Sequence, residues 1–480
     1  MVKVLANSNI RFLIFESMME PSIFPENFLS SMANEPGFDV ENFKNAHAFL
    51  QSPTSVRINP NKKAIEKIEQ TVPWCHDGSY LESRPSFTFD PHFHAGCYYV
   101  QEASSMFIDH IFKFIRPDFN DTIKVLDLCA APGGKSTLIS SALNDGDLLV
   151  ANEIIKTRVP VLCDNLNRWG KANTIISNND PKDFVRLNGF FNMILVDAPC
   201  SGSGMFRKDP DAMNEWSDAN VNLCHQRQER ILADIYPALN EDGYLIYSTC
   251  SYSHQENEAI LDWLCDTYNM ESIRIPIYNE WGIVETQSEK NGAWGYRFYP
   301  GKVKGEGLFA ACLQKKEKSN EPPFFRNKNN QKLDQKDLAM IRSKLIEPEE
   351  YYLFKVADDW MAINHCHKDS MDILQRQLYL KKSGVRIGKL IGNDLIPDHE
   401  FALSLIIDKE SFINTPLDLP NAIKYLQREN MDQVFEGKGW SLMTYEGFVL
   451  GWAKLLPGRI NNYYPKEIRI LSPQPPKGGV

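Results

Sequence analysis

Long hydrophobic runs are absent from this sequence of 480 residues, and that absence excludes the simplest class of membrane protein. No apolar segment approaches the roughly 18 residues that a membrane-spanning helix needs. The N-terminal stretch MVKVLANSNIRFLIFESMM has a short apolar patch, but Arg11 interrupts it and no small-residue cleavage site follows. We therefore expect neither a secretory signal nor a membrane partner.

A cysteine pattern typical of secreted proteins is also lacking. The ten cysteines are scattered along the chain without the spacing of a disulfide framework, so we expect a reducing, cytoplasmic location. The segment WCHDGSYLESRPSFTFDPHFHAGC invites a zinc site, but its spacing matches no common zinc pattern. Its thiols and imidazoles are Cys75, His76, His92, His94 and Cys97. The cluster at 365–367 is weaker still, and we predict no metal.

Positive charge is scarce as well. The chain has 52 Lys and Arg against 62 Asp and Glu, a net charge of −10. Taken alone, this balance argues mildly against a nucleic-acid partner, because basic patches supply most of that affinity. Whole-chain charge can hide a local patch, however. Residues 315–344 are rich in Lys and Arg, and we interpret them first as a solvated linker and second as a candidate RNA contact.

Short apolar runs alternate with segments of helical period in the middle of the chain, from about residue 121 to 314. Runs rich in Val, Ile and Leu predict strands at 124–128, 147–152, 172–177, 191–197 and 243–250. The segments KSTLISSAL and VNLCHQRQERILADIYPAL predict helices. This alternation indicates a doubly wound α/β fold with a parallel sheet covered on both faces. Such sheets bind ligands beyond the carboxyl ends of their strands, where the strand order reverses.

The first of these strands runs directly into a glycine-rich turn, CAAPGGKST at 129–137. Such a turn lets backbone amides approach a ligand near the positive end of a helix dipole. A nucleoside-triphosphate loop would need a glycine five positions before Gly134, where Cys129 stands. Glu153 closes the second strand, where an acid accepts hydrogen bonds from ribose hydroxyls, and Asp180 follows the third strand. We therefore predict a dinucleotide or nucleoside cofactor.

Two further strand-like segments each end in a cysteine. LVDAPCSGSG at 195–204 carries Cys200, and LIYSTCS at 245–251 carries Cys250. For a random pair of cysteines, packing as small hydrophobic residues is the simpler explanation. A structural disulfide is the other alternative, which the expected cytosolic setting opposes.

These motifs together resemble one family. DLCAAPGGKST, FNMILVDAPCSGSGMFRKDP and YSTCSYSHQENE closely resemble the Sun/Fmu-type RNA cytosine-5 methyltransferases. The agreement extends through SVRINP, GCYYVQEASSM and RFYPGKVKGEGLF, and it covers about residues 20–317. Many members place a histidine where this chain has Gly301, to which we assign no role. The rest of the chain is similar to the bacterial branch that modifies small-subunit ribosomal RNA.

The resemblance implies a cofactor and a covalent mechanism. The cofactor is S-adenosylmethionine, and the residues expected to bind it are Cys129, Ala130, Ala131, Pro132, Gly133, Gly134, Lys135, Glu153, Asp180 and Asp197. By resemblance, Cys250 is the nucleophile that adds to carbon 6 of cytosine, which activates carbon 5 toward the methyl group. Cys200 then assists release of the product, and Asp197 hydrogen-bonds the amidine edge of the base.

We expect the following division of the chain: an extension outside the fold (1–19), an N-terminal α+β RNA-binding region (20–116), the catalytic domain (117–317), a linker (318–337), an intermediate region (338–400) and a PUA-like β-barrel (401–475). In the N-terminal region, Arg57 is a candidate phosphate contact. In the PUA-like region, aromatic residues around a YEG turn predict a hairpin and a following strand.

Within the expected barrel, Trp440 and Trp452 are candidates to fill the core. The better candidates to touch phosphate are Lys454, Arg459 and Lys466.

We therefore predict a monomeric RNA cytosine-5 methyltransferase that acts on small-subunit ribosomal RNA, free or in an assembling subunit. A transfer-RNA methyltransferase of the same family is the nearest alternative. A non-catalytic RNA-binding assembly factor is another, although the intact cysteines and cofactor turn oppose it. DNA cytosine methyltransferases place their nucleophile in the proline-cysteine motif, so the STCS segment favours RNA.

Overall fold

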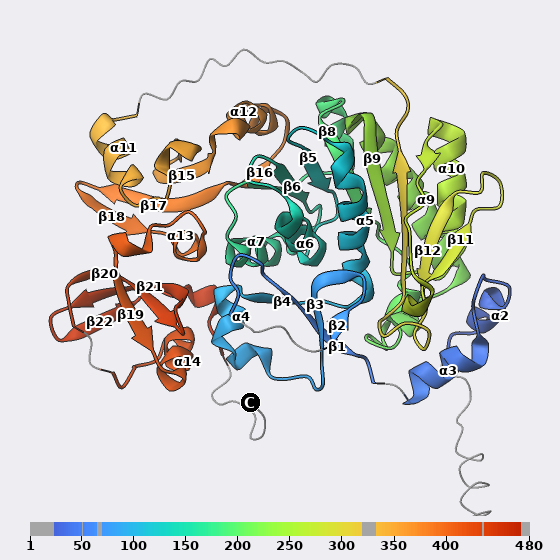
Figure 1. The fold of residues 1–480 in the computed structure, drawn as a ribbon, viewed down its shortest axis with the longest axis horizontal. Coiled ribbons are helices and arrows are strands. Elements are labelled where there is room, and N and C mark those ends of the chain that lie inside the picture. The colour runs from blue at the N-terminus through green and yellow to red at the C-terminus, as the bar shows by residue number, and fades with distance from the viewer. Residues whose placement is uncertain (1–23, 50, 65–69, 319–332, 434–435, 472–480) are drawn as a thin grey trace, which may run out of the picture.

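The computed structural model describes residues 24–49, 51–64, 70–318, 333–433 and 436–471. A large central sheet with helices on both faces lies between short N-terminal helices and two smaller C-terminal sheets (Figure 1). The expected extension at 1–19, most of the expected linker and residues 472–475 lie outside the described residues.

The central sheet has ten strands in the order β11-β12-β13-β9-β8-β5-β6-β7-β16, with β10 paired to β13. Its parallel strands are β5 (Lys124–Asp127), β6 (Leu148–Asn152), β7 (Thr174–Ser177), β8 (Phe191–Asp197) and β9 (Leu239–Thr249). Each predicted strand is thereby confirmed. The chain proceeds outward from β5 through β6 and β7, then crosses to β8 and β9 on the other side. The strand order therefore reverses between β5 and β8, where such sheets bind ligands.

The part of the sheet beyond β9 is antiparallel. It consists of β10 (Glu271–Ser272), β11 (Val284–Gln287), β12 (Trp294–Phe298) and β13 (Leu308–Gln314), which pairs with β9.

Helices cover both faces because successive strand residues point to opposite sides. Val125 of β5 packs in a core with α5 (Phe107–Ile115), α6 (Gly134–Ala142) and α7 (Val159–Trp169). Its neighbour Leu126 packs in a second core with α9 (Asp218–Ile235), α10 (Glu258–Tyr268) and α12 (Lys368–Gln377). The continuous apolar strands of the sequence follow from this double coverage.

The N-terminal region mixes helices and strands, as expected. Its helices are α2 (Phe28–Met32), α3 (Val40–Phe49) and α4 (Pro91–Ala95), and its antiparallel strands are β1 (Thr54–Ile58), β2 (Thr71–Val72), β3 (Cys75–Leu81) and β4 (Tyr98–Val100). The α4 helix begins where the Asp90 side chain accepts the His92 amide, and it ends at Gly96 with φ 76°. A Cβ on Gly96 would lie 2.0 Å from the Arg168 carbonyl oxygen, so this close approach requires glycine.

The expectation that Arg57 contacts RNA phosphate is wrong. Its side chain is 1% exposed and lies between β1 and α6. Its guanidinium donates to Gln101 Oε1 at 2.8 Å and to Thr137 Oγ1 at 2.6 Å, and it lies 4.5 Å from the centre of the Trp169 ring. Arg57 therefore joins the N-terminal sheet to the helix that follows the glycine-rich turn.

Two smaller sheets follow the central one. The first contains β14 (Tyr351–Val356), β15 (Asp359–Asn364), β17 (Val385–Ile391) and β18 (Asp394–Pro397), and the second β19 (Ile413–Leu417), β20 (Gly439–Tyr445), β21 (Phe448–Leu456) and β22 (Arg459–Asn462). The remaining helices are α8 (Ala212–Glu215), α11 (Gln335–Arg342), α13 (His399–Leu403) and α14 (Leu419–Gln427).

The second sheet contains the hairpin that the YEG turn predicted. Tyr445 pairs with Phe448, and the turn residues Glu446 and Gly447 have φ values of 48° and 82°. Positive φ at both central positions is typical of a two-residue hairpin turn. Trp440 and Trp452 are buried in one core, as expected.

One strand of the central sheet comes from a region where the sequence predicted no strand. β16 (Leu380–Ser383), from the expected intermediate region, pairs antiparallel with β7 and extends the central sheet. The C-terminal part also packs on the N-terminal sheet, because Tyr98 and Val56 share a core with Tyr425 and Leu450. The described part of the chain contains no helix that is both long and apolar enough to cross a membrane.

Candidate active site at the carboxyl edge of the central sheet

The expected cofactor turn follows β5 and lies beside the point where strand order reverses. Gly133 has φ 114°, a conformation that favours glycine, and Gly134 begins α6. Within the turn, Ala130 and Ala131 are buried and Pro132 is exposed. Cys129 is half-buried against the second core. A backbone hydrogen bond joins the turn to the end of β6, because the Ala130 amide donates to the Asn152 carbonyl at 2.8 Å.

Glu153 lies beneath this turn at the end of β6. Its side chain is 2% exposed and accepts the amides of Ala131 at 3.2 Å and Ile155 at 2.8 Å. Arg158 lies 3.7 Å from the same carboxylate. A carboxylate has about four acceptor positions, so Glu153 retains capacity for the hydroxyls of a ribose.

The surroundings of Glu153 fit a nucleoside. Ile154 and Ile155 directly follow it and are 47% and 48% exposed, so two large apolar side chains border a buried acid. These two side chains offer apolar surface against which a flat base could pack. Asp180 lies at the end of the neighbouring strand, half-exposed, where it accepts the Lys182 amide at 3.2 Å. These residues fit the flat apolar base and the two ribose hydroxyls of S-adenosylmethionine.

Asn152 is a residue that the sequence reasoning missed. Its amide nitrogen donates to the carbonyls of Leu128 and Asn179, and its oxygen accepts from Ser177 Oγ and from the Asn179 amide. It thus joins the turn after β5 to the loop that carries Asp180. The signal in the sequence was a polar residue at the end of an otherwise apolar strand.

Lys135 and Asp197 form an ion pair across the point of strand reversal. Their Nζ and Oδ2 atoms lie 2.8 Å apart, and Ser248 Oγ donates to the other carboxylate oxygen at 2.8 Å. Burial disfavours the charge on Lys135, but the contact with Asp197, together with Asp127 and Cys250, outweighs that effect, and the pKa of Lys135 is raised. The Asp197 side chain remains about a third exposed. Its carboxylate, fixed by Lys135 and Ser248, therefore faces solvent beside the expected cofactor site.

Cys200 and Cys250 meet at the ends of β8 and β9. Parallel pairing sets Asp197 beside Ser248, which brings the two following loops together. Both cysteines are free thiols, and their Sγ atoms lie 3.0 Å apart. The hydrogen bond to Cys250, with burial, raises the pKa of the Cys200 thiol well above its ordinary value. The raised pKa favours the neutral thiol at Cys200, and either sulfur can be the donor in this contact.

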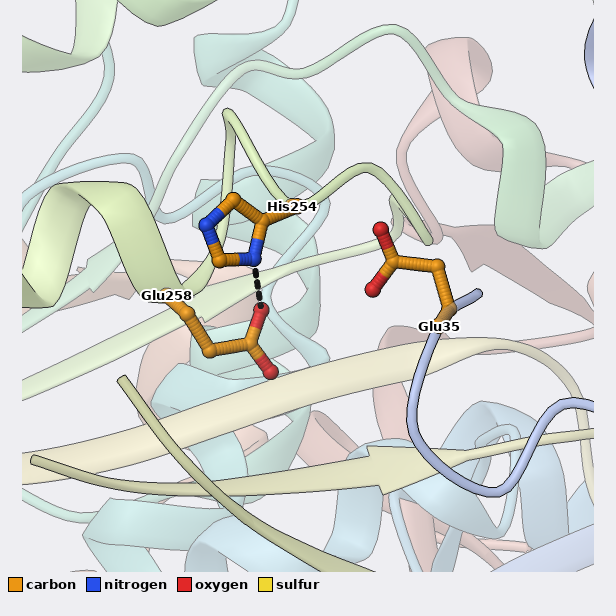
Figure 2. Close-up of side chains that lie close together, drawn as sticks. All are labelled: Glu35, His254 and Glu258. Atoms are coloured by element: carbon orange, nitrogen blue, oxygen red, sulfur yellow. Dashed lines mark ion pairs between the residues drawn. The ribbon is translucent and has the colours of Figure 1, made fainter. Parts of the chain in front are cut away.

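The residues that invited a zinc site are not brought together. Cys75 and Cys97 belong to different cores, and His92 faces Asp90 and Glu446. Among the residues that the structure describes, one other group has ligand atoms within 4.8 Å of one another: Glu35, His254 and Glu258 (Figure 2).

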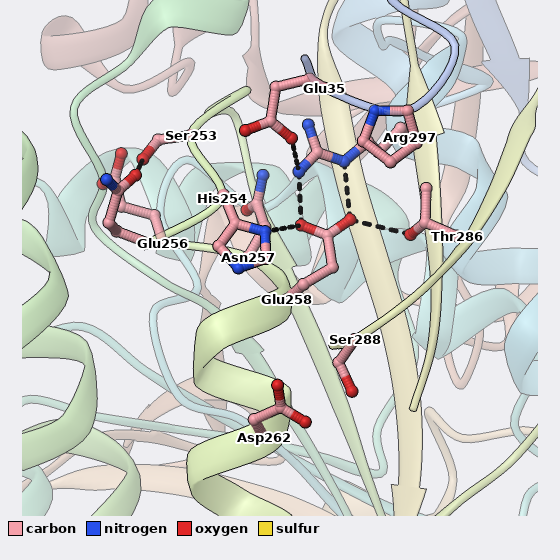
Figure 3. A network of polar contacts seen from close by, with 12 residues as sticks. Glu35, Ser253, His254, Glu256, Asn257, Glu258, Asp262, Thr286, Ser288 and Arg297 are labelled. Atoms are coloured by element: carbon pink, nitrogen blue, oxygen red, sulfur yellow. Dashed lines mark hydrogen bonds and ion pairs between the residues drawn. The ribbon is translucent and has the colours of Figure 1, made fainter. Parts of the chain in front are cut away.

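That group does not fit a metal ion. Arg297 lies between its carboxylates, with Nη2 2.7 Å from Glu35 and Nε 2.7 Å from Glu258 (Figure 3). Burial opposes the negative charge on Glu258, but Arg297 holds the pKa of Glu258 below its ordinary value. A guanidinium thus already supplies the cation, and the group joins the N-terminal helices to the central sheet.

The C-terminal candidates for phosphate contact differ in their surroundings. Lys454 lies 3.1 Å from Asp394 and 5.1 Å from the centre of the Trp440 ring, so its charge is partly neutralised. Arg459 and Lys466 are exposed on the second small sheet and just after it.

Comparison with known proteins agrees with this arrangement. Family models match three parts of the chain: the 16S rRNA methyltransferase RsmB/F at 113–314, the N-terminal domain of 16S rRNA methyltransferase RsmF at 24–103 and the methyltransferase RsmF PUA domain at 412–470. Ribosomal RNA small subunit methyltransferase F of Psychromonas ingrahamii is 30% identical over 458 residues, covering 86% of this chain and 90% of its own. The chain belongs to the RsmF family of 16S ribosomal RNA methyltransferases.

Further comparisons support the same assignment. Ribosomal RNA small subunit methyltransferase F of Vibrio parahaemolyticus is 28% identical and covers 94% of this chain and 98% of its own. Among solved structures, NSun6 from Pyrococcus horikoshii with SFG, an analogue of S-adenosylmethionine, has a TM-score of 0.50 at 18% identity. It covers 62% of this chain and 99% of its own, and it shares the fold. This RsmF-family chain is an S-adenosylmethionine-dependent RNA methyltransferase, as the sequence motifs predicted.

Proposed function

We propose that this protein methylates carbon 5 of a cytosine in small-subunit ribosomal RNA through a covalent bond from Cys250 to carbon 6 of the base. The observation that supports this proposal is the 3.0 Å contact between two free thiols beside the Lys135–Asp197 ion pair. S-adenosylmethionine supplies an electrophilic methyl group on a sulfonium centre. Carbon 5 of cytosine is too weak a nucleophile to attack that group directly, so the protein must activate the ring.

Cys250 is suited to activate the ring because a second thiol and a positive charge lie close to it. The Cys200 thiol shares a hydrogen bond with it, and the positive charge of Lys135 interacts with it. A thiolate adds to carbon 6 and makes carbon 5 electron-rich, and carbon 5 then takes the methyl group. Asp197 hydrogen-bonds the amidine edge of the base, which favours addition at carbon 6.

Cys200 acts after the methyl group is transferred. Once the Cys250 sulfur is bonded to carbon, it no longer accepts the Cys200 proton or carries a charge. The main effect that raises the pKa of Cys200 is thereby removed, so Cys200 gives up its proton more readily than before the transfer. The Cys200 thiolate then takes the proton from carbon 5, the bond from Cys250 to carbon 6 breaks, and Cys250 leaves as a thiolate.

Single substitutions separate the two roles. With substrate RNA and S-adenosylmethionine, Cys250→Ala is expected to form no protein–RNA adduct and to transfer no methyl group. Cys200→Ala is expected to transfer the methyl group and then stall, so that a denaturation-resistant adduct accumulates on a gel. The double variant forms no adduct. Cys265→Ala, a half-buried cysteine on α10, is the matched control and retains activity.

Two results would overturn this assignment. An adduct in Cys250→Ala but not in Cys200→Ala would mean that the two roles are reversed. Methylation without an adduct in either variant would exclude the covalent mechanism. Bisulfite sequencing of ribosomal and transfer RNA from a deletion strain distinguishes the proposed substrate from the transfer-RNA alternative. A strain that loses no 5-methylcytosine would favour a non-catalytic assembly factor.

A further inference from the structure

A single buried carboxylate contacts both loops that carry the thiols. Glu256 is 0% exposed and lies between β9 and α10, in the loop drawn in Figure 3. Its Oε1 accepts the Ser201 amide at 2.8 Å, and its Oε2 accepts the hydroxyls of Ser201 and Ser251, each at 2.5 Å. Each serine directly follows one of the two cysteines. Gln228 Nε2 lies 3.3 Å from Oε1 and completes the set.

These contacts fix the distance between the thiols. The loops after β8 and β9 also share the bond from the Gly204 amide to the Cys250 carbonyl, at 2.7 Å. Glu256 adds hydrogen bonds to the residue that follows each cysteine, so the two loops are joined both by the backbone and by this carboxylate. Short hydrogen bonds to a carboxylate are among the stronger ones in proteins.

The charge of Glu256 acts on the Cys200 thiol. The ion pairs of the described residues do not include Glu256, so its negative charge is balanced by hydrogen bonds alone. This charge contributes to the raised pKa of Cys200, after the hydrogen bond to Cys250 and burial. The positive charge of Lys135 interacts with Cys250. An anion close to Cys200 disfavours a thiolate at that residue.

We propose that Glu256 is a positioning residue that holds the two thiols in contact and disfavours negative charge on Cys200. This inference rests on the proposed function, because it explains why Cys250 and not Cys200 is the nucleophile. Glu256 touches neither base nor cofactor and acts only through the cysteine loops. Its neighbour Glu258 is equally buried but pairs with Arg297 instead, which makes it a matched control.

Alkylation of the free protein tests the proposal without RNA or cofactor. Iodoacetamide reacts with thiolates, and peptide mapping by mass spectrometry measures the rates at Cys250 and Cys200 between pH 6 and 9. We expect Cys250 to react first in the native protein. Glu256→Gln keeps the shape but removes the charge, and the ratio of the two rates is expected to fall at least fivefold. Glu258→Gln is expected to leave the ratio unchanged.

Activity gives a second readout. In Glu256→Gln, kcat is expected to fall at least tenfold while the RNA KM and the affinity for S-adenosylmethionine stay within twofold. Glu256→Ala, which also removes the hydrogen bonds, is expected to lose more activity than Glu256→Gln. Should Glu256→Gln fail to fold, Ser251→Ala removes one donor and is expected to lower the alkylation ratio at least twofold.

The outcomes separate this inference from the proposed function. An unchanged alkylation ratio in folded Glu256→Gln overturns the role of Glu256, whether or not the native protein methylates RNA. A lowered ratio together with a native protein that forms no RNA adduct would overturn the proposed function, while the effect of Glu256 on the thiols would stand. A ratio that falls equally in Glu258→Gln would show a general loss of packing and would also overturn the inference.

Discussion

Replacing Arg57 distinguishes a structural role from a role in RNA binding. The Arg57 guanidinium is buried and donates to Gln101, Thr137 and Ser141 at 2.8, 2.6 and 3.2 Å. Arg57→Ala would remove these bonds and leave buried acceptors without a partner, at about 1.5 kcal/mol for each bond from a charged donor. The contact with the Trp169 ring adds about 1 kcal/mol.

The cost of burying the charge offsets part of this loss. Burial lowers the pKa of Arg57 to about 10, so the folded protein already bears a desolvation penalty that alanine would relieve. The net destabilisation is expected to be roughly 3 kcal/mol, or about 6 °C in Tm at ~2 °C per kcal/mol. Thermal unfolding followed by circular dichroism measures this shift. Lys63→Ala, a substitution of an exposed neighbour, is the control and is expected to change Tm by less than ~1 °C.

RNA binding at several salt concentrations gives the opposing test. A phosphate contact contributes about one unit to the slope of log affinity against log salt. Because Arg57 is buried, Arg57→Ala is expected to leave that slope unchanged at a temperature where the variant is folded. A slope reduced by about one, with Tm unaffected, would refute the structural argument and restore the phosphate contact that the sequence suggested.

Two further predictions concern the carboxylates near the cofactor turn. Glu153→Ala is expected to weaken S-adenosylmethionine binding at least tenfold in calorimetry, with a smaller effect for Glu153→Gln, which retains one acceptor; unchanged affinity would contradict the ribose contact. Burial raises the pKa of Asp127 to about 7 from the usual value of 3.8, so the folded state binds a proton more tightly than the unfolded state. Native stability is therefore expected to fall as pH rises from about 4 to 7, and Asp127→Asn should remove that part of the pH dependence in urea unfolding.

The residues around the thiols show how far sequence reasoning reached. Cys200 and Cys250 were predicted because each ends an apolar strand within its own motif. Their 3.0 Å contact was not contained in those motifs, because it depends on the parallel register of β8 and β9. Glu256 was missed because nothing in its sequence neighbourhood distinguishes it from the equally acidic Glu258. Only burial and hydrogen-bond partners separate the two carboxylates.

The sequence by itself determined the strands, the glycine-rich turn and the acids that follow the strands, because apolar period, turn residues and strand ends are local properties. Tertiary structure alone decided that Arg57 is buried, that β16 joins β7 across about two hundred residues of chain, and that one carboxylate holds both cysteine loops. Residue type sets what a side chain can do, but its neighbours are set by contacts between distant segments. An arginine on a strand is equally able to bind phosphate or to fill a polar gap in a core, and only the packing of α6 and Trp169 around it selects the second.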